Sequence, residues 1–189
     1  MMLAKKEVSI HIGELYATRD STVIKTVLGS CVAVCLYDPA SRIGGMNHIL
    51  LPGKPDIKHF SENTRYGINA MELLINRIME LGGCRQRIVA KIFGGSHLFL
   101  SISKENGTGM KNVKFVLEFL KTEKIKVISK NTGGQASRRI YFHTDTGDVF
   151  LKRTQSVCYS GITMKEQKKY LKEINIPPSP QYPWEVPVD

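Results

Sequence analysis

The sequence is poor in the features that mark secreted and membrane-spanning proteins. No apolar stretch approaches the roughly eighteen residues of a membrane-spanning helix, and the N-terminal segment MMLAKKEVSIHIGEL lacks the apolar core of a signal peptide. The four cysteines do not form a CxxC motif: Cys31, Cys35, Cys84 and Cys158. We therefore expect a soluble, cytoplasmic protein that keeps its thiols reduced and does not insert into membranes.

Metal and nucleotide sites are not indicated either. Four histidines fail to combine with the cysteines in any recognisable zinc spacing: His11, His59, His97 and His143. No G-x-G-x-x-G or P-loop pattern follows a candidate strand. We therefore predict no metal, no cofactor and no doubly wound nucleotide-binding fold.

Acidic residues are outnumbered, and the chain has a net charge of +10. Most of this excess lies in residues 104–172, whereas residues 173–189 are net acidic. A positive field speeds encounter with an acidic partner, which could be nucleic acid, an anionic membrane surface or an acidic protein. Because the basic half lacks aromatic residues interleaved in the order of a known stacking module, we expect no nucleic-acid binding.

The pattern of hydrophobic residues predicts a single α/β domain of the α+β type, with a mixed, largely antiparallel sheet, helices packed on it and an extended C-terminal tail. Two helices are predicted, over residues 61–81 and from a cap at Asn112 to about Glu123. Strands are predicted over residues 8–12, 23–27, 32–37, 46–51, 87–93, 126–129, 139–143 and 148–153.

The C-terminal part has a different composition from the domain. Thr163 to Glu166 fits a capping box for a short basic helix that ends near Glu173. The last fourteen residues, IPPSPQYPWEVPVD, contain five prolines, too many for a helix or an interior strand. We therefore divide the chain into a domain over residues 1–160 and a short helix with a proline-rich extension over residues 161–189.

One pair of residues stands out as a candidate catalytic pair. Cys31 follows a Gly-Ser pair, and His48 returns seventeen residues later across a predicted hairpin with its turn at Asp38 to Ser41. If that turn is centred on Pro39-Ala40, Cys31 lies opposite His48 on one face of the hairpin, and a slip of two residues keeps the face. A nucleophilic cysteine needs a base within reach, and an imidazole supplies one.

Several motifs in order resemble the CheD family of chemoreceptor glutamine deamidases. They cover roughly residues 8–153: LGSCVAVCLYDP, GGMNHILLP, RYGINAMELLINRIMELGG, KIFGGS, GTGMKNVKFVLEFL and NTGGQASRRIYFHTDTGDVFLKR. The resemblance implies hydrolysis of selected glutamine side chains to glutamate on the cytoplasmic helices of chemotaxis receptors. It also implies binding to a CheC-type phosphatase, and in some members cleavage of receptor methyl esters.

The resemblance carries the nucleophile onto Cys31 and the base onto His48. The family also uses a threonine, usually six residues before the cysteine, where this sequence has Lys25, with Thr26 five residues before. Because residues at odd and even offsets in a strand point to opposite faces, Thr26 can serve as the third member only if a bulge or bend intervenes. Lys25 offers an alternative role, in which its charge lowers the pKa of the cysteine.

The sequence offers two groups of candidate donors to an oxyanion. Backbone N–H groups near Gly29-Ser30-Cys31 or near Gly94-Gly95 could serve, since glycine permits close backbone approach.

A second functional hypothesis makes the protein a basic adaptor for receptors or for the phosphatase, with a thiol site weakened by Lys25. Cys35, Cys84 and Cys158 are interpreted as packing residues.

Overall fold

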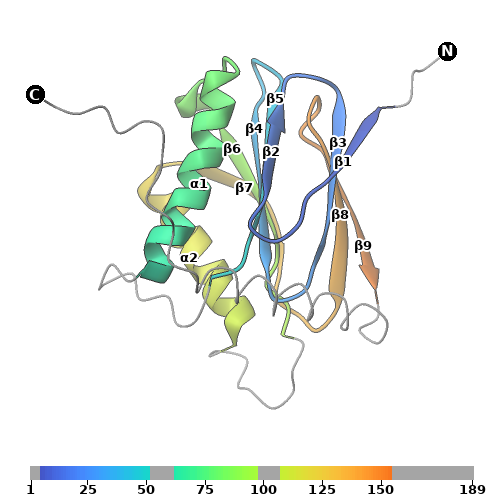
Figure 1. Cartoon of the computed structure of the whole chain (residues 1–189), viewed down its shortest axis with the longest axis vertical. Helices are drawn as coiled ribbons and strands as arrows, with labels where there is room; N and C mark the ends of the chain where they lie inside the picture. The colour runs from blue at the N-terminus through green and yellow to red at the C-terminus, as the bar shows by residue number, and fades with distance from the viewer. Residues whose placement is uncertain (1–4, 52–61, 98–106, 155–189) are drawn as a thin grey trace, which may run out of the picture.

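The computed structural model describes residues 5–51, 62–97 and 107–154. Within these residues the chain forms one α/β domain, in which two helices pack on one of two mixed sheets (Figure 1). The predicted fold class is therefore confirmed, and the structure adds that the strands are divided between two sheets. The predicted helix from Thr163, the proline-rich tail and the boundary at residue 160 lie outside the described residues.

The strands stack as a sandwich with the helices on one outer face (Figure 1). The first sheet contains, in spatial order, β1 (Lys6–Ser9), β3 (Thr22–Leu28), β8 (Ser137–His143) and β9 (Val149–Thr154). The second contains β2 (Leu15–Thr18), β5 (Ile43–Ile49), β4 (Val32–Asp38), β6 (Val89–Gly94) and β7 (Lys126–Thr132). Only β1 with β3 and β6 with β7 are parallel, so antiparallel pairing dominates among the described strands, as the predicted hairpins require.

The two helices cover the second sheet. Helices α1 (Glu62–Glu80) and α2 (Thr108–Thr122) bury apolar stripes against it. The turn that follows α1 contains Gly82, whose positive φ of 101° suits a glycine. No helix in the described part of the chain is long and apolar enough to span a membrane. The helix–sheet layer is one of two cores, and the other lies between the two sheets.

The core between the sheets is where the candidate site lies. Alternate residues of β3, β4, β5 and β8 point into it because successive side chains of a strand face opposite ways. Its buried members include Ile24, Leu28, Cys31, Ala33, Cys35, Met46, Leu50, Ile140 and Phe142. Polar side chains that share this compartment are therefore shielded from bulk water.

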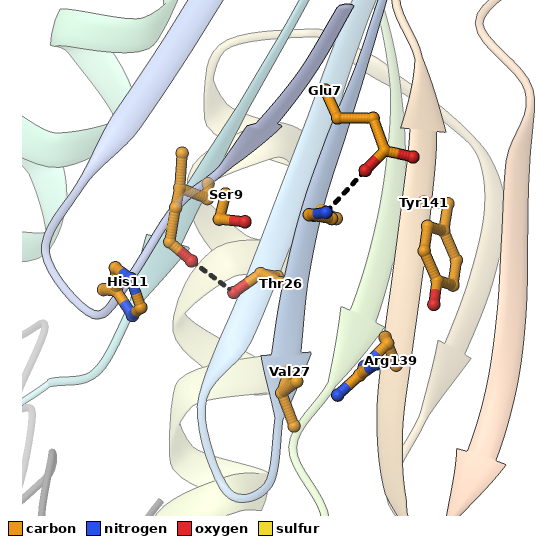
Figure 2. Close-up of a pocket in the computed structure, with 9 residues that line it drawn as sticks. Glu7, Ser9, His11, Thr26, Val27, Arg139 and Tyr141 are labelled. Carbon is orange, nitrogen blue, oxygen red and sulfur yellow. Dashed lines mark hydrogen bonds and ion pairs between the residues drawn. The ribbon is translucent and has the colours of Figure 1, made fainter.

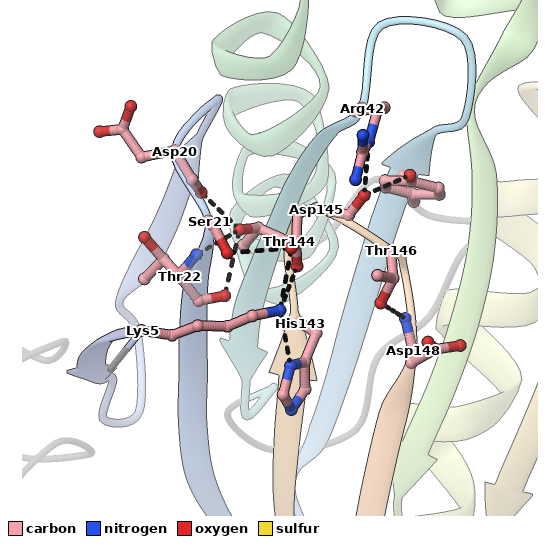
Figure 3. Close-up of polar contacts among 11 residues, drawn as sticks. Lys5, Asp20, Ser21, Thr22, Arg42, His143, Thr144, Asp145, Thr146 and Asp148 are labelled. Atoms are coloured by element: carbon pink, nitrogen blue, oxygen red, sulfur yellow. Dashed lines mark hydrogen bonds and ion pairs between the residues drawn. The ribbon is translucent and has the colours of Figure 1, made fainter. Parts of the chain in front are cut away.

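Polar contacts join the two sheets at the end of the sandwich that carries the β4–β5 and β8–β9 turns (Figure 3). The backbone carbonyl of Asp145 accepts hydrogen bonds from Tyr37 Oη on β4 at 2.9 Å and from Arg42 Nε in the β4–β5 connection at 3.1 Å. The Asp145 carboxylate accepts from Lys5 Nζ at 2.8 Å and from Ser21 Oγ. Specific hydrogen bonds therefore hold this end of the sandwich together, and Cys31 lies at the opposite end of β4.

Two elements differ from the sequence predictions. Strand β2 was not expected, because LYAT is too short to show a clear period. Helix α2 begins at Thr108 after Gly107, so the prediction that Asn112 caps it is wrong. Asn112 is buried inside the helix, and its side chain makes contacts that bear on the site.

Candidate active site

The predicted pairing of Cys31 directly opposite His48 is wrong by two residues. In the hairpin His48 pairs with Ala33, and Asp38 pairs with Ile43, so four residues connect the strands in place of a two-residue turn. Arg42 in this connection has a positive φ of 53°, a conformation that the longer loop requires. Since the shift is two residues, Cys31 and His48 remain on one face and both lie in the compartment between the sheets, with 0% and 2% of their surface exposed.

Thr26 joins this pair from the other sheet. It lies on β3 with its side chain buried, and its Oγ1 lies 2.8 Å from Nδ1 of His48 on β5. The same hydroxyl donates a hydrogen bond of 2.7 Å to the backbone carbonyl of Ile10, which Figure 2 shows from the outer side of β3. The hydroxyl therefore links the imidazole to the chain segment that leaves β1.

These two bonds determine how the imidazole is protonated. A hydroxyl has one proton, and a carbonyl oxygen only accepts, so the Thr26 proton goes to Ile10 and its oxygen accepts from His48. Nδ1 of His48 therefore carries the hydrogen, and Nε2 of the neutral ring has a free lone pair. Among the described residues Nε2 is buried and has no hydrogen-bond partner.

Burial also keeps the ring neutral. Desolvation by burial, with a smaller coulombic contribution from His11, lowers the pKa of His48 to about 3. At neutral pH the imidazole is thus an uncharged base that presents Nε2 inside the compartment. Nε2 is therefore the nitrogen of His48 that can accept a proton, while Nδ1 stays bonded to Thr26.

The structure meets the condition placed on Thr26 but gives no support to the alternative role of Lys25. Thr26 pairs with Ile140 in regular register, and the chain bends at Gly29-Ser30-Cys31, between Thr26 and the start of β4. The turn of Gly29-Ser30-Cys31 carries the chain into the second sheet. The alternation of side chains along β3 therefore does not determine which way Cys31 points. Lys25 lies on the outer face of β3 and forms a 2.5 Å ion pair with Glu7, away from the compartment.

Backbone bonds hold the turn that carries Cys31. The Gly95 N–H donates to the Cys31 carbonyl at 2.7 Å, and the Ser96 N–H donates to the Gly29 carbonyl at 2.8 Å. Gly94 has a positive φ of 109°, and a Cβ there would lie 2.2 Å from the Cys31 carbonyl oxygen. Glycine at this position is therefore required by the close approach of the two backbones.

Asn112 is a residue of this region that the sequence reasoning did not assign. Its Nδ2 donates to the Ser30 carbonyl at 2.9 Å, and its Oδ1 accepts from the Leu51 N–H at 3.1 Å. It thereby ties the turn before Cys31 to the chain just after β5. The signal was present, because Asn112 stands four residues before Val116 on the buried face of the helix, where a polar side chain needs partners.

The remaining described cysteines do not join the site. Cys35 lies on β4 in the core between the sheets, which confirms its packing role, and burial raises the pKa of its thiol far above the ordinary value. Cys84 is partly exposed, and its Sγ donates to Gln86 Oε1. Cys158 lies outside the described residues. Nowhere in the described ranges do three or more His, Cys, Asp or Glu side chains gather as a metal site would require.

A surface cavity of about 380 Å³ borders the outer side of Thr26 (Figure 2). It is lined by residues of β1, β3 and β8, among them Lys25 and Arg139, and by His11 from the segment after β1. Neither Cys31 nor His48 lines it, but Thr26, which does, contacts His48 on its other side.

Comparisons with known proteins agree with the motifs. The model of the CheD family, described as CheD chemotactic sensory transduction, matches residues 50–153. The chain is 42% identical over 177 residues to "Probable chemoreceptor glutamine deamidase CheD 1" of Shewanella oneidensis, which covers 92% of this chain and 84% of that protein.

Two further relatives are similar to the chain over a smaller part of it. A "Probable chemoreceptor glutamine deamidase CheD" of Vibrio cholerae is 42% identical over 154 residues, or 77% of this chain and 65% of that protein. A "Probable chemoreceptor glutamine deamidase CheD 1" of Dechloromonas aromatica is 43% identical over 145 residues, or 77% of this chain and 72% of that protein. On the family match over more than half of its length, and on these relatives, the chain belongs to the CheD family.

Proposed function

We propose that this protein is a cytoplasmic hydrolase that converts glutamine side chains to glutamate on the cytoplasmic helices of chemotaxis receptors. Cys31 is the nucleophile, His48 is the base, and Thr26 positions the base. The names of the relatives support the substrate class. No metal or cofactor takes part in this route.

The observation that carries the proposal is the bonding of His48. Its Nδ1 is held as a donor to Thr26 Oγ1 at 2.8 Å, while its Nε2 is buried and unpartnered among the described residues. A structural histidine in an apolar core ordinarily has both nitrogens satisfied, since an unpaired polar atom costs about 1–3 kcal/mol. An acceptor kept without a partner on the same face as a thiol suits a general base.

The reaction then follows in two halves. His48 Nε2 takes the thiol proton of Cys31, and the thiolate attacks Cδ of the glutamine side chain, forming a C–S bond. The imidazolium returns the proton to the amide nitrogen as the C–N bond breaks, so ammonia leaves and a thioester remains. A water molecule gives a proton to Nε2 and adds to the thioester, and cleavage of the C–S bond releases glutamate and the thiol.

The backbone contacts narrow the choice of oxyanion donors. The Gly95 N–H already donates to the Cys31 carbonyl, so it is engaged in holding the turn. Of the two groups that the sequence suggests, the turn of Gly29 to Cys31 is therefore favoured over Gly95 as the donor to the tetrahedral intermediate. A substrate bound there places its reacting carbon next to the thiol.

The burial of Cys31 and His48 favours a side-chain amide as the reacting group of the substrate. Cys31 and His48 have almost no exposed surface, so a reacting group must reach inward from the polypeptide that carries it. A glutamine carboxamide stands on two methylene groups and can do so, whereas a backbone amide cannot without unfolding its own chain. Exclusion of bulk water also strengthens the proton transfers between thiol and imidazole.

A direct assay tests the proposal. The protein is incubated with a receptor cytoplasmic fragment, and each converted glutamine adds about one mass unit to the peptide that contains it, because an amide becomes an acid. We expect Cys31→Ala to abolish the gain and Cys35→Ala to retain it. An unchanged receptor mass with the wild-type protein, at concentrations where the two bind, would refute the hydrolase proposal in favour of the adaptor.

The adaptor hypothesis has lost the observation that motivated it. It rested on Lys25 in place of the family threonine, but Thr26 makes the bond to His48 and Lys25 faces the other way. Binding to a CheC-type phosphatase remains compatible with the hydrolase and is proposed as a second interaction. It is tested by co-purification of this protein with the phosphatase.

A further inference from the structure

A basic groove lies where the edges of the two sheets meet, on the side formed by β7, β8 and β9. Its volume is about 480 Å³, and three of its lining residues are cationic: Lys130 on β7, Arg138 on β8 and Arg153 on β9. The other lining side chains are Asn131, Thr132, Gln135 and Ala136. None of the residues that line the groove is acidic.

Arg138 forms the floor of the groove, and among the described residues its charge has no counter-ion. Only 3% of its surface is exposed, and its guanidinium donates to Asn131 Oδ1 at 2.8 Å, to Ser96 Oγ at 2.5 Å and to the Gly133 carbonyl. All of these acceptors are neutral. The guanidinium stays charged at any accessible pH. Its N–H groups therefore have hydrogen-bond acceptors, but no negative charge among the described residues balances its buried positive charge.

Arg153 adds a second positive charge next to Arg138. It pairs directly with Arg138 across β8 and β9, and like charges opposite each other destabilise a sheet. Burial lowers the pKa of Arg138, and the charge of Arg153 lowers it further. Within the described ranges neither Lys130 nor Arg153 has an ion pair with an Asp or Glu side chain. Three cations thus converge on a groove with no described anion.

The groove also adjoins the turn that carries Cys31. It shares Gly134 and Gln135 with a second cavity of about 450 Å³, which is bordered by Gly95 and His97. Gly95 donates its N–H to the Cys31 carbonyl, and His97 donates its N–H to the Gly134 carbonyl at 2.7 Å. In Figure 1 the β3–β4 turn and the β7–β8 loop lie at the same end of the sandwich.

We propose that this groove binds a carboxylate side chain of the polypeptide whose glutamine reacts at Cys31, so that an acidic residue flanking the target amide determines substrate preference. Lys130 and Arg153 contact the carboxylate, because their side chains are exposed and unpaired within the described residues. Arg138 supplies a fixed charge beneath them and holds the surrounding loops, since its own N–H groups are already bonded. The inference rests on the proposed deamidase function for the identity of the polypeptide.

Binding is measured first, without catalysis. The Cys31→Ser protein is titrated into two fluorescein-labelled peptides with one central glutamine each, one carrying glutamates on both sides and the other serines at the same positions. We expect the acidic peptide to bind about tenfold more tightly at low salt, and the difference to shrink as salt is added. Equal affinities for the two peptides would overturn the inference.

A matched pair of variants locates the effect. Arg153→Glu should lower affinity for the acidic peptide about tenfold and leave affinity for the serine peptide nearly unchanged. Lys152→Glu makes the same charge change on the same strand but on its other face, because neighbouring residues alternate, and should have little effect. If Lys152→Glu weakens binding as much as Arg153→Glu does, general attraction to a basic protein explains the result and the groove assignment is wrong.

Turnover then separates this inference from the function on which it rests. With the wild-type thiol, the ratio of kcat/KM for the acidic and serine peptides should fall about tenfold in Arg153→Glu. If neither peptide nor any receptor fragment is deamidated while the binding preference persists, the hydrolase proposal fails and the groove assignment stands. If both peptides react at equal rates, the hydrolase proposal stands and the groove assignment fails.

Discussion

Thr26 and His48 come from different sheets, and their side chains meet in the space between those sheets, with Oγ1 of Thr26 2.8 Å from Nδ1 of His48. The hydroxyl accepts from the ring because its own proton goes to the Ile10 carbonyl. The sandwich therefore sets the tautomer of the imidazole through one contact between its layers. Several measurable consequences follow from this contact and from its neighbours.

Replacement of Thr26 by valine removes the acceptor of the Nδ1 hydrogen and keeps the shape of the side chain. We expect Thr26→Val to lower kcat for deamidation about 100-fold, because the ring loses the contact that orients it as a base. Thr26→Ser keeps the hydroxyl and should recover most of the activity. Lys25→Ala on the outer face is the matched control, and an equal loss of kcat there would contradict the assigned role of Thr26.

The stability of the protein should depend on pH through His48. Its pKa is about 3 in the folded state and about 6.5 when unfolded, so the unfolded chain binds more protons between these values. The free energy of unfolding therefore falls as pH falls, by about 2 kcal/mol between pH 7 and pH 5 from this group alone. Urea unfolding at the two pH values measures it. A wild-type stability that does not change between them would show that the ring is not held neutral.

His48→Gln provides the comparison for this measurement. The amide of glutamine is uncharged at both pH values, so the variant should lose less stability than the wild type on going from pH 7 to pH 5. Any difference that remains belongs to other titrating groups. If both proteins lose the same stability between pH 7 and pH 5, groups other than His48 cause the pH dependence.

Asn112 should affect both stability and activity. Asn112→Ala leaves the Ser30 carbonyl and the Leu51 N–H without their partner, and such a loss costs about 1–3 kcal/mol for buried groups. Because Ser30 precedes Cys31, we also expect kcat to fall. Met110→Ala, an exposed position on the same helix, serves as control in thermal unfolding and in the deamidation assay. Unchanged kcat in Asn112→Ala would limit this residue to a structural role.

Asp38 should affect stability alone. Its buried carboxylate accepts from Arg87 Nε at 3.0 Å and Nη2 at 2.8 Å, and these bonds hold the pKa of the carboxyl far below its usual value. Asp38→Asn removes the charge opposite Arg87 and should lower the free energy of unfolding by about 2–4 kcal/mol, measured by urea unfolding. Asp38 lies at the end of the hairpin away from Cys31, so kcat at a temperature where the variant is folded should match the wild type.

Local patterns in the sequence were sufficient for most elements of the fold. The apolar spacing in residues 61–81 predicted α1, and the alternation around Thr144 to Gly147 predicted the hairpin of β8 and β9. The hairpin that carries His48 was also predicted, but its register was not. Register depends on the number of loop residues, and Arg42 adopts a left-handed conformation that its residue type does not announce.

The division of the strands into two sheets could not be predicted, and it is what assembles the candidate site. Strand periodicity reports which residues share a face within one strand, but not which sheet the next strand joins. The bulge or bend that Thr26 requires is present at Gly29-Ser30-Cys31, but the sequence does not show that the chain changes sheets there. Thr26 and His48 meet through a long-range contact between the two sheets.

The strand order has a consequence for how the site responds to fluctuations. Thr26 and His48 lie on β3 and β5, and Cys31 directly precedes β4, and each of these strands has a bonded neighbour on both sides. Amide hydrogens of such interior strands exchange with solvent mainly through global unfolding, whereas those of edge strands also exchange through local fraying. Deuterium uptake should therefore be slowest around the thiol, the imidazole and the hydroxyl. Their relative geometry should last as long as the folded state itself.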